Sequence, residues 1–285
     1  MGKIFGLVAL FVCAVTAHAE ETIVAGTWHS MMSKVMGEER AYAVYLPPSY
    51  EDEERRFPVI YVLDGDQTRF KGVSALVENL STENMEGQIP QFIVVAIPNT
   101  DRTRDLTPTH TLAFFKDQTS DELATSGGAS RFLQFFEDEL IPHMDATYRT
   151  TDSRMLVGES YGGLFTANAL LSGRNIFSHY LVTDATYIWD NNYLNRALDE
   201  QLAEGYAPEG KIYFSFANNA AFGEMGETNL AWGKAFAAKL ETAQSDRFHV
   251  RHQYFEHESH GTVALQSWYH GFRYFYEGDG KKGEK

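Results

Sequence analysis

One serine near the middle of the chain stands between closely spaced glycines, in the segment GESYGG at residues 158–163. The apolar run at 155–157 and the small and apolar residues that follow the segment predict a strand, a tight turn and a helix. That order is the context of the G-x-S-x-G nucleophile motif, whose glycines leave room for a turn that exposes the serine hydroxyl. Ser160 is therefore the candidate nucleophile. The Tyr161 N–H, at the expected start of the helix, is a candidate donor to an oxyanion.

A serine hydroxyl is a weak nucleophile unless a general base takes its proton. In the fold that carries this motif the chain order is serine, acid, histidine, so the base is expected near the end of the chain. Five histidines lie between residues 249 and 270, and two of them, His249 and His252, fall within an expected strand. His260 comes after that strand and directly before a glycine and a predicted helix start. We favour His260 as the base over its neighbour His257.

The acid that would orient His260 is expected after the strand predicted at residues 211–217. In the loop that follows, Glu224 is the first candidate because it lies between two glycines, and Glu227 is the second. Asp184, which follows the preceding strand, is the third candidate. A pair of Ser160 and His260 that works without an acid also remains open.

Other residues at predicted strand ends are candidates for the rest of the pocket. A second oxyanion donor is expected from the loop after the strand at 57–63, where the N–H of Gly65 or Asp66 is suitably placed. Arg102 and Arg104 follow another strand and would bind a carboxylate or another anion of the substrate. The alternative for these two arginines is a structural network with neighbouring aspartates.

Two aromatic residues, Tyr187 and Trp189, follow the strand predicted at residues 180–182. They are candidate walls of the substrate pocket, and core packing is an equal alternative.

Short apolar runs alternate with helical patterns along the chain, which predicts an α/β fold with a mostly parallel sheet covered by helices on both faces. In such sheets the ligand site lies at the carboxyl ends of the strands. The expected strands are residues 41–46, 57–63, 92–97, 155–157, 180–182, 211–217 and 248–254, and the expected helices are 131–140, 162–171, 228–240 and 263–276.

The 285 residues include 39 acidic and 24 basic side chains, which gives a net charge of −15. This charge argues against nucleic acid as a partner and against a polybasic mode of membrane binding. Hydrophobic residues make up 44% of the chain, which is ample for a large buried core and argues against extended disorder. We expect no metal and no cofactor. The sequence does not indicate an oligomeric state.

The first 19 residues have the pattern of a secretory signal peptide: Lys3, an apolar run at 4–17, and the small residues Ala17 and Ala19 at a cleavage site. This pattern predicts an exported protein, periplasmic or secreted, with no membrane contact after cleavage. The rest of the chain is expected to form a catalytic domain at 20–278 and a flexible tail at 279–285. Cys13 is the only cysteine, so the mature chain would lack disulfides and thiol nucleophiles.

Taken together, these motifs resemble the Putative esterase family of α/β hydrolases. That family includes esterase D-type hydrolases, feruloyl and acetyl-xylan esterases, siderophore esterases and mycolyltransferases. The resemblance covers residues 42–276 and is closest to an exported bacterial branch with siderophore-hydrolase-like esterases. It rests on VYLPPSY at 44–50, PVIYVLDG at 58–65, Asn99 with RTRDLTP at 102–108, GESYGG at 158–163, HGT at 260–262 and GFR at 271–273.

The resemblance implies the α/β-hydrolase fold, with Ser160 as nucleophile, His260 as base and a small-molecule ester as substrate. The chain departs from the family at the acid, because relatives often have an aspartate roughly where Asn219 stands. We rank an exported serine hydrolase of simple carboxylic esters first and a siderophore lactone esterase second. Acyl transfer to an acceptor other than water, and a domain that only binds an ester ligand, are the remaining alternatives.

Overall fold

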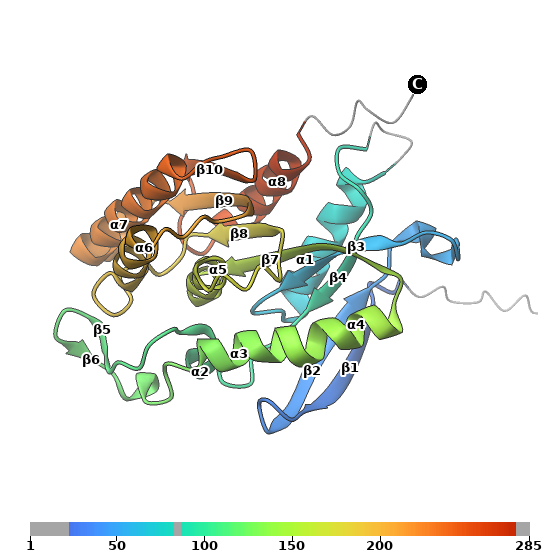
Figure 1. Cartoon of the computed structure of the whole chain (residues 1–285), viewed down its shortest axis with the longest axis horizontal. Coiled ribbons are helices and arrows are strands. Elements are labelled where there is room, and N and C mark those ends of the chain that lie inside the picture. Colours follow the sequence, from blue (N-terminus) through green and yellow to red (C-terminus); the bar gives the residue numbers. More distant parts are fainter. Residues whose placement is uncertain (1–22, 83–86, 278–285) are drawn as a thin grey trace, which may run out of the picture.

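The computed structural model describes residues 23–82 and 87–277, so the expected signal peptide, Cys13 and the expected tail at 279–285 lie outside the described residues. Eight strands form one sheet in the order β1-β2-β4-β3-β7-β8-β9-β10 (Figure 1). The pairs β1–β2 and β2–β4 are antiparallel, and all the other neighbouring strands are parallel. The strands are β1 Thr27–Ser33, β2 Glu38–Tyr45, β3 Phe57–Val62, β4 Ile93–Ala96, β7 Thr150–Glu159, β8 His179–Thr183, β9 Gly210–Ala217 and β10 Phe248–Phe255.

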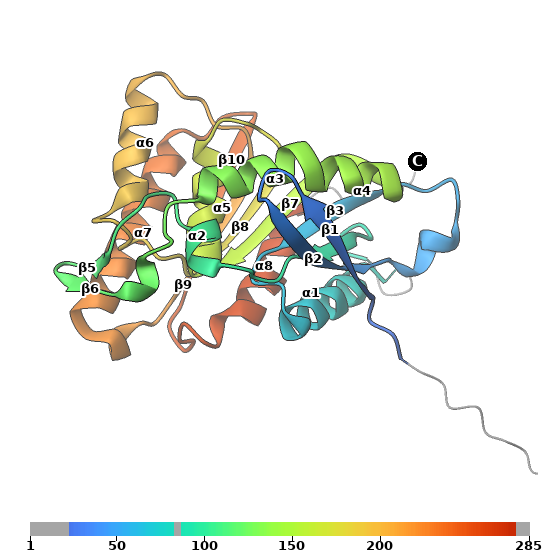
Figure 2. The same ribbon diagram turned by 90° about the horizontal axis from the view of Figure 1, so that it is seen from below.

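Helices cover both faces of this sheet. The main helices are α1 Gln67–Leu80, α2 Arg102–Leu106, α3 Ala129–Phe135, α4 Ile141–Thr147, α5 Tyr161–Leu171, α6 Tyr193–Ala203, α7 Gly223–Thr242 and α8 Val263–Phe275. Figure 2 shows α1 and α8 below the sheet and α3 to α6 above it. Apolar residues of α7 belong to the same core cluster as those of α3 to α6. The expected α/β architecture is therefore confirmed.

The alternation of strand side chains builds a core on each face. In β3, Val59 and Tyr61 belong to the larger core cluster, whereas Ile60 and Val62 belong to the smaller one with residues of α1 and α8. All four side chains are at most 1% exposed. Because neighbouring side chains in a strand point to opposite faces, a strand buried on both sides is apolar throughout. This explains why the central strands could be recognised as continuous apolar runs.

The structure differs from the sequence-based expectation at several elements. The strand expected at 155–157 extends over Thr150–Glu159, and the helix expected at 228–240 begins at Gly223. The edge strand β1 and the helices α1 and α6 were not predicted. A small hairpin, β5 Ala113–Phe115 with β6 Gln118–Thr119, was not predicted either. The early start of α7 matters for function because it places Glu224 in the first turn of a helix.

Phe136 lies at the centre of an aromatic cluster in the larger core and is fully buried. Truncation of a buried phenylalanine leaves a cavity, so we expect Phe136→Ala to lower the free energy of unfolding by about 3–5 kcal/mol. Urea unfolding followed by fluorescence measures this change. Phe222→Ala, at a side chain that is 51% exposed, is the control and should cost less than about 1 kcal/mol. Equal losses in the two variants would contradict this account of the core. The ring of Phe136 contacts those of Tyr61, Phe132, Phe135, Phe165 and Phe177.

Candidate active site

Ser160 sits on the turn between β7 and α5 with a backbone φ of 59° and ψ of −117°. A positive φ is uncommon for a residue with a side chain and is tolerated only where the surroundings enforce it. Here the surroundings are glycines: a Cβ on Gly158 would lie 2.1 Å from the carbonyl oxygen of Gly162, and one on Gly163 would lie 2.9 Å from Cβ of Ala185. The predicted strand, tight turn and helix are confirmed, and the glycines are needed for close packing.

The side chains of Ser160 and His260 line one cavity of about 290 Å³ at the carboxyl end of the sheet. Its walls are mainly apolar and come from the loop after β8, the β5–β6 hairpin and the start of α7. Among the described residues, the Ser160 hydroxyl makes its hydrogen-bond contact with Thr186 Oγ1 at 3.5 Å rather than with His260. Catalytic contacts of this kind often tighten only when substrate binds. The cavity lining comprises Phe114, Ser160, Asp184, Ala185, Thr186, Ile188, Asn219, Phe222, Met225, Gly226, Asn229 and His260.

Asp184 is the carboxylate that contacts His260. Its Oδ2 lies 2.6 Å from His260 Nδ1, and the aspartate is only 2% exposed. The backbone N–H of Ala217 donates to Oδ1 at 3.1 Å, and the amide of Asn219 donates to Oδ2 at 2.8 Å. The contact at Nδ1 leaves the other ring nitrogen, Nε2, available to exchange a proton with a bound reactant.

The expectation that Glu224 orients His260 is wrong. The Glu224 carboxylate is 70% exposed and pairs with Lys116 of the hairpin instead. The reason is that α7 begins at Gly223, so the glycines around Glu224 mark a helix start rather than a loop that folds over the site. Glu227, the second candidate, is an exposed residue of the same helix. Asp184, the third candidate, takes the position.

The contact with Asp184 raises the pKa of His260 above its ordinary value. The hydrogen bond is the largest cause, because a nearby carboxylate stabilises the protonated ring. Partial burial lowers this pKa, the charge of Glu159 raises it and the charge of Arg102 lowers it. The net result is that the ring holds a proton more readily than an ordinary histidine. It is neutral, and so able to act as a base, only at pH values above the raised pKa.

The N–H of Tyr161 is suitably placed to donate to an oxyanion, since it is the first residue of α5 and has no acceptor within its helix. The expectation for Gly65 and Asp66 is wrong. The Gly65 N–H donates to the Ile97 carbonyl at 2.8 Å, and the Asp66 N–H donates to the Asp64 carbonyl at 2.7 Å. Gly65 is instead a packing glycine, because a Cβ there would lie 2.4 Å from the Ile97 nitrogen. Asp66 caps α1, where its carboxylate accepts two backbone N–H groups.

The two arginines expected to bind substrate are both paired with carboxylates. Arg104, in the middle of α2, pairs with Glu38 and Asp105, so the alternative of a structural network is confirmed for it and the expected substrate role is wrong. Arg102 binds both carboxylate oxygens of Asp64, at 2.7 and 2.9 Å, and its guanidinium lies over the Tyr161 ring. It does line a polar cleft of about 220 Å³, but its charge is matched there by Asp64.

Tyr187 and Trp189 pack in the core, so the core-packing alternative is confirmed and the expectation that they form pocket walls is wrong. They are 1% and 0% exposed, and the Trp189 Nε1–H donates to Thr109 Oγ1 at 3.0 Å. Other residues of the same loop, Ala185, Thr186 and Ile188, line the cavity in their place. The loop after β8 does reach the cavity, but its two large aromatic side chains point into the core.

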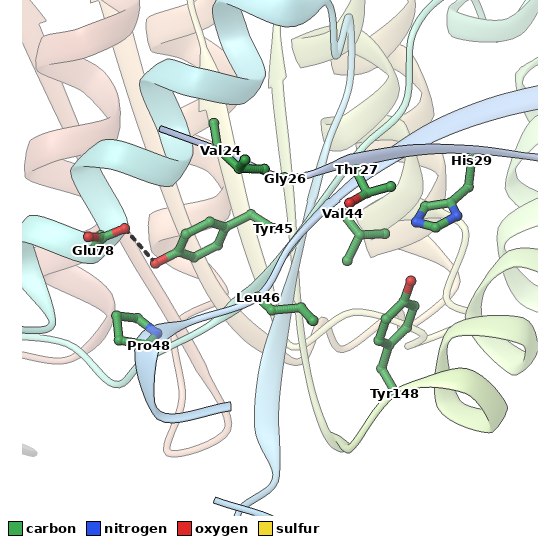
Figure 3. A pocket seen from close by; sticks show the side chains of 11 residues that line it. Val24, Gly26, Thr27, His29, Val44, Tyr45, Leu46, Pro48, Glu78 and Tyr148 are labelled. Atoms are coloured by element: carbon green, nitrogen blue, oxygen red, sulfur yellow. Dashed lines mark hydrogen bonds between the residues drawn. The ribbon is translucent and has the colours of Figure 1, made fainter. Parts of the chain in front are cut away.

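A cavity of about 330 Å³ lies elsewhere, between the start of β1, the end of β2 and α1 (Figure 3). Figure 3 shows the Tyr45 hydroxyl directed at Glu78, to which it donates a hydrogen bond of 3.0 Å. This cavity includes neither Ser160 nor His260. Since its size is similar, chemistry and not volume singles out the cavity beside Ser160 as the candidate active site.

The described residues contain no group of three or more histidine, cysteine, aspartate or glutamate side chains arranged to hold a metal ion. Within the same part of the chain, none of the helices is both long and apolar enough to cross a membrane.

The chain is similar in sequence and fold to known proteins. A family model described as Putative esterase matches residues 33–274. A solved structure of an IroE-like serine hydrolase from Shewanella oneidensis is 32% identical, with a TM-score of 0.82, and covers 88% of this chain and 80% of that chain. The structure of the siderophore hydrolase EstB from Aspergillus nidulans, at 19% identity, shows the likeness of fold alone, with a TM-score of 0.70 and coverage of 91% and 97%.

The ferri-bacillibactin esterase BesA of Bacillus subtilis strain 168 is 29% identical over 185 residues. That alignment covers 62% of this chain and 64% of BesA. The chain spans 59% of another, uncharacterised Bacillus subtilis protein that it matches.

The raised pKa of His260 can be measured without a substrate. We expect NMR titration to show that the His260 ring loses its proton at a higher pH than an exposed histidine, because Asp184 stabilises the cation. His260→Gln assigns the signal among the ten histidines. Asp184→Asn removes the main cause, so it should lower this pKa. A signal that titrates at the same pH in Asp184→Asn would contradict the assignment of the acid.

Proposed function

Because the chain belongs to the Putative esterase family of α/β hydrolases, we propose that it hydrolyses carboxylic esters through an acyl-enzyme on Ser160. His260 is the general base and Asp184 is the acid that orients it. The observation that carries the proposal is the 2.6 Å contact between His260 Nδ1 and Asp184 Oδ2 at a cavity that Ser160 also lines. This is the arrangement that activates a serine hydroxyl.

The reaction proceeds in two halves. Ser160 Oγ attacks the ester carbonyl while His260 Nε2 takes the hydroxyl proton, and Asp184 stabilises the imidazolium that forms. The oxyanion of the tetrahedral intermediate faces the Tyr161 N–H at the positive end of α5. His260 then gives the proton to the departing alcohol. In the second half, His260 takes a proton from water, the hydroxide attacks the acyl group, and Ser160 recovers its proton.

Siderophore esters are the second candidate substrate after simple carboxylic esters. The observation that favours them is the likeness to BesA, named as a ferri-bacillibactin esterase, and to an IroE-like serine hydrolase. The chain's net charge of −15 opposes the binding of an anionic ferric complex. Arg102 offers a local cation that is 37% exposed, but it is already bound to Asp64. A neutral ester group near Ser160 therefore suits this site better than an anionic one.

We also propose that the enzyme acts outside the cytoplasm, in the periplasm or the medium. The support is the pattern of residues 1–19, with Lys3, an apolar run and small residues at the cleavage site. Fractionation of cells that express the full chain, with mass spectrometry of the mature N-terminus, tests this. Intact protein that still begins at residue 1 in the cytoplasm would contradict it.

The test of the esterase is the turnover of p-nitrophenyl acetate, butyrate and octanoate, with an iron-loaded and an iron-free triscatecholate lactone beside them. We expect wild-type turnover and a loss of at least about 10⁴-fold in kcat for Ser160→Ala. Ser172→Ala, at the other end of α5, is the matched control and should keep full activity. Turnover that persists in Ser160→Ala would overturn the proposal. Binding of these esters without any turnover would favour the non-catalytic alternative.

The choice between the two carboxylates is tested by Asp184→Asn and Glu224→Gln. We expect Asp184→Asn to lower kcat by at least about 100-fold, because the imidazolium loses its partner. Glu224→Gln should change kcat less than twofold, since Glu224 is exposed and bound to Lys116. A large loss of kcat in Glu224→Gln with little change in Asp184→Asn would instead identify Glu224 as the acid.

A further inference from the structure

One carboxylate oxygen of Asp184 is shared between two side chains. Oδ2 lies 2.6 Å from His260 Nδ1 and accepts the Asn219 amide at 2.8 Å, while Oδ1 accepts the backbone N–H of Ala217 at 3.1 Å. Asp184 and Asn219 are 2% and 5% exposed. In such a buried place hydrogen bonds set the direction of a carboxylate more strongly than in water.

The topology of the sheet brings the two residues together. Asp184 directly follows β8, and Asn219 follows β9, its parallel neighbour. The backbone N–H of Asp184 donates to the Ser215 carbonyl at 2.9 Å, which ties the end of β8 to β9. Gly226 of α7 packs on Asn219 so closely that a Cβ there would lie 2.0 Å from the Asn219 carbonyl oxygen. The Asn219 carbonyl also accepts the backbone N–H of Phe222 at 2.9 Å, so the backbone at this position is fixed by contacts of its own.

The side chain at position 219 must donate to Asp184, and an amide can do this without adding charge. Its other atom, Oδ1, is buried and has no hydrogen-bond partner among the described residues. A buried acceptor without a partner costs free energy. The Asn219 side chain therefore donates a hydrogen bond through its NH2 group, while its carbonyl oxygen accepts none from the described residues. A carboxylate at 219 would instead place two like charges in contact and disfavour both.

We propose that Asn219 is a positioning residue for the ester hydrolysis proposed above, on which this inference rests. Its amide fixes the Asp184 carboxylate so that Oδ2 faces His260. Asp184 and Asn219 thus form one carboxylate–amide pair at two neighbouring strand ends. Exchanging the two keeps one charge, one amide and the hydrogen bond between them. In the exchanged variant, the carboxylate at position 219 would lie next to the position that Asp184 Oδ2 now occupies beside His260.

The test compares the kinetics of three variants on p-nitrophenyl butyrate with those of the wild type. Asn219→Ala should lower kcat about tenfold with less than a twofold change in KM, since it alters the direction of the acid and not the binding of the ester. Asp184→Asn should lower kcat by at least about 100-fold. The double variant Asp184→Asn/Asn219→Asp should recover at least about tenfold over Asp184→Asn, which a purely structural role of Asn219 would not produce.

Asn219→Asp alone supplies a readout that needs no turnover. Two adjacent carboxylates beside His260 should raise its pKa above the wild-type value in an NMR titration. If this variant retains turnover, its activity should fall on acidification at a higher pH than that of the wild type does.

Asn229→Asp in the Asp184→Asn background is the matched control. Asn229 lines the same cavity, but its side chain binds the backbone of Ala185 and Ile188 and not Asp184. We expect no recovery of activity from it. Thermal unfolding of each variant identifies those that fail to fold, and the single variant Asn219→Ser provides a milder substitute.

Two results would overturn the inference in folded proteins. One is a double variant no more active than Asp184→Asn, and the other is an Asn219→Ala enzyme with wild-type kcat. Failure of the proposed function looks different, because the wild type itself would then hydrolyse no ester. In that case the His260 titration in Asn219→Asp still reports whether position 219 belongs to the acid.

Discussion

The strained turn at Ser160 is the constraint on which the rest of the site depends. Its φ of 59° occurs where β7 and α5 meet at glycines, and a Cβ on Gly158 would lie 2.1 Å from the carbonyl oxygen of Gly162. The same packing brings α5 against the loop after β8, where Gly163 meets Ala185. Asp184 precedes that alanine, so the turn that carries Ser160 also packs against the strand end that carries Asp184. Strain at Ser160 is thus offset by burial around it.

Charge is the second constraint, since two carboxylates lie close to the nucleophile in an already acidic chain. Glu159 precedes Ser160 and pairs with Arg69 at 2.8 Å, and Asp64 pairs with Arg102. Glu159 and Asp64 are 8% and 5% exposed, so an unpaired charge on either would be costly. In the proposed mechanism, the two arginines neutralise carboxylates that would otherwise repel the oxyanion, which is a different task from binding an anionic substrate.

Ser160 and His260 could be named from the sequence as candidate nucleophile and base because their signals are local. GESYGG carries its own turn, and His260 lies in the short segment between the last strand and the last helix. The acid could not be chosen, because three carboxylates follow two neighbouring strands and only the start of α7 decides between them. The residue at which α7 begins depends on how the helix packs on β9 and Asn219, and no local sequence pattern indicates that contact. The sequence showed that Asn219 stands where relatives often have an aspartate. It did not show that Asn219 would bind Asp184, because the two residues follow different strands.

The walls of the cavity differ in how firmly they are held, and this bears on what enters it. The floor comes from Ala185, Thr186 and Ile188, which are at most 7% exposed and lie on a loop tied to β9. The roof includes Phe114 of the β5–β6 hairpin, and the tip of that hairpin reaches α7 through the Lys116–Glu224 pair. With side chains 56% and 70% exposed, such a pair contributes at most about 1 kcal/mol. The depth of the cavity is therefore set by a rigid floor, whereas its mouth can adjust at little cost to the ester that binds.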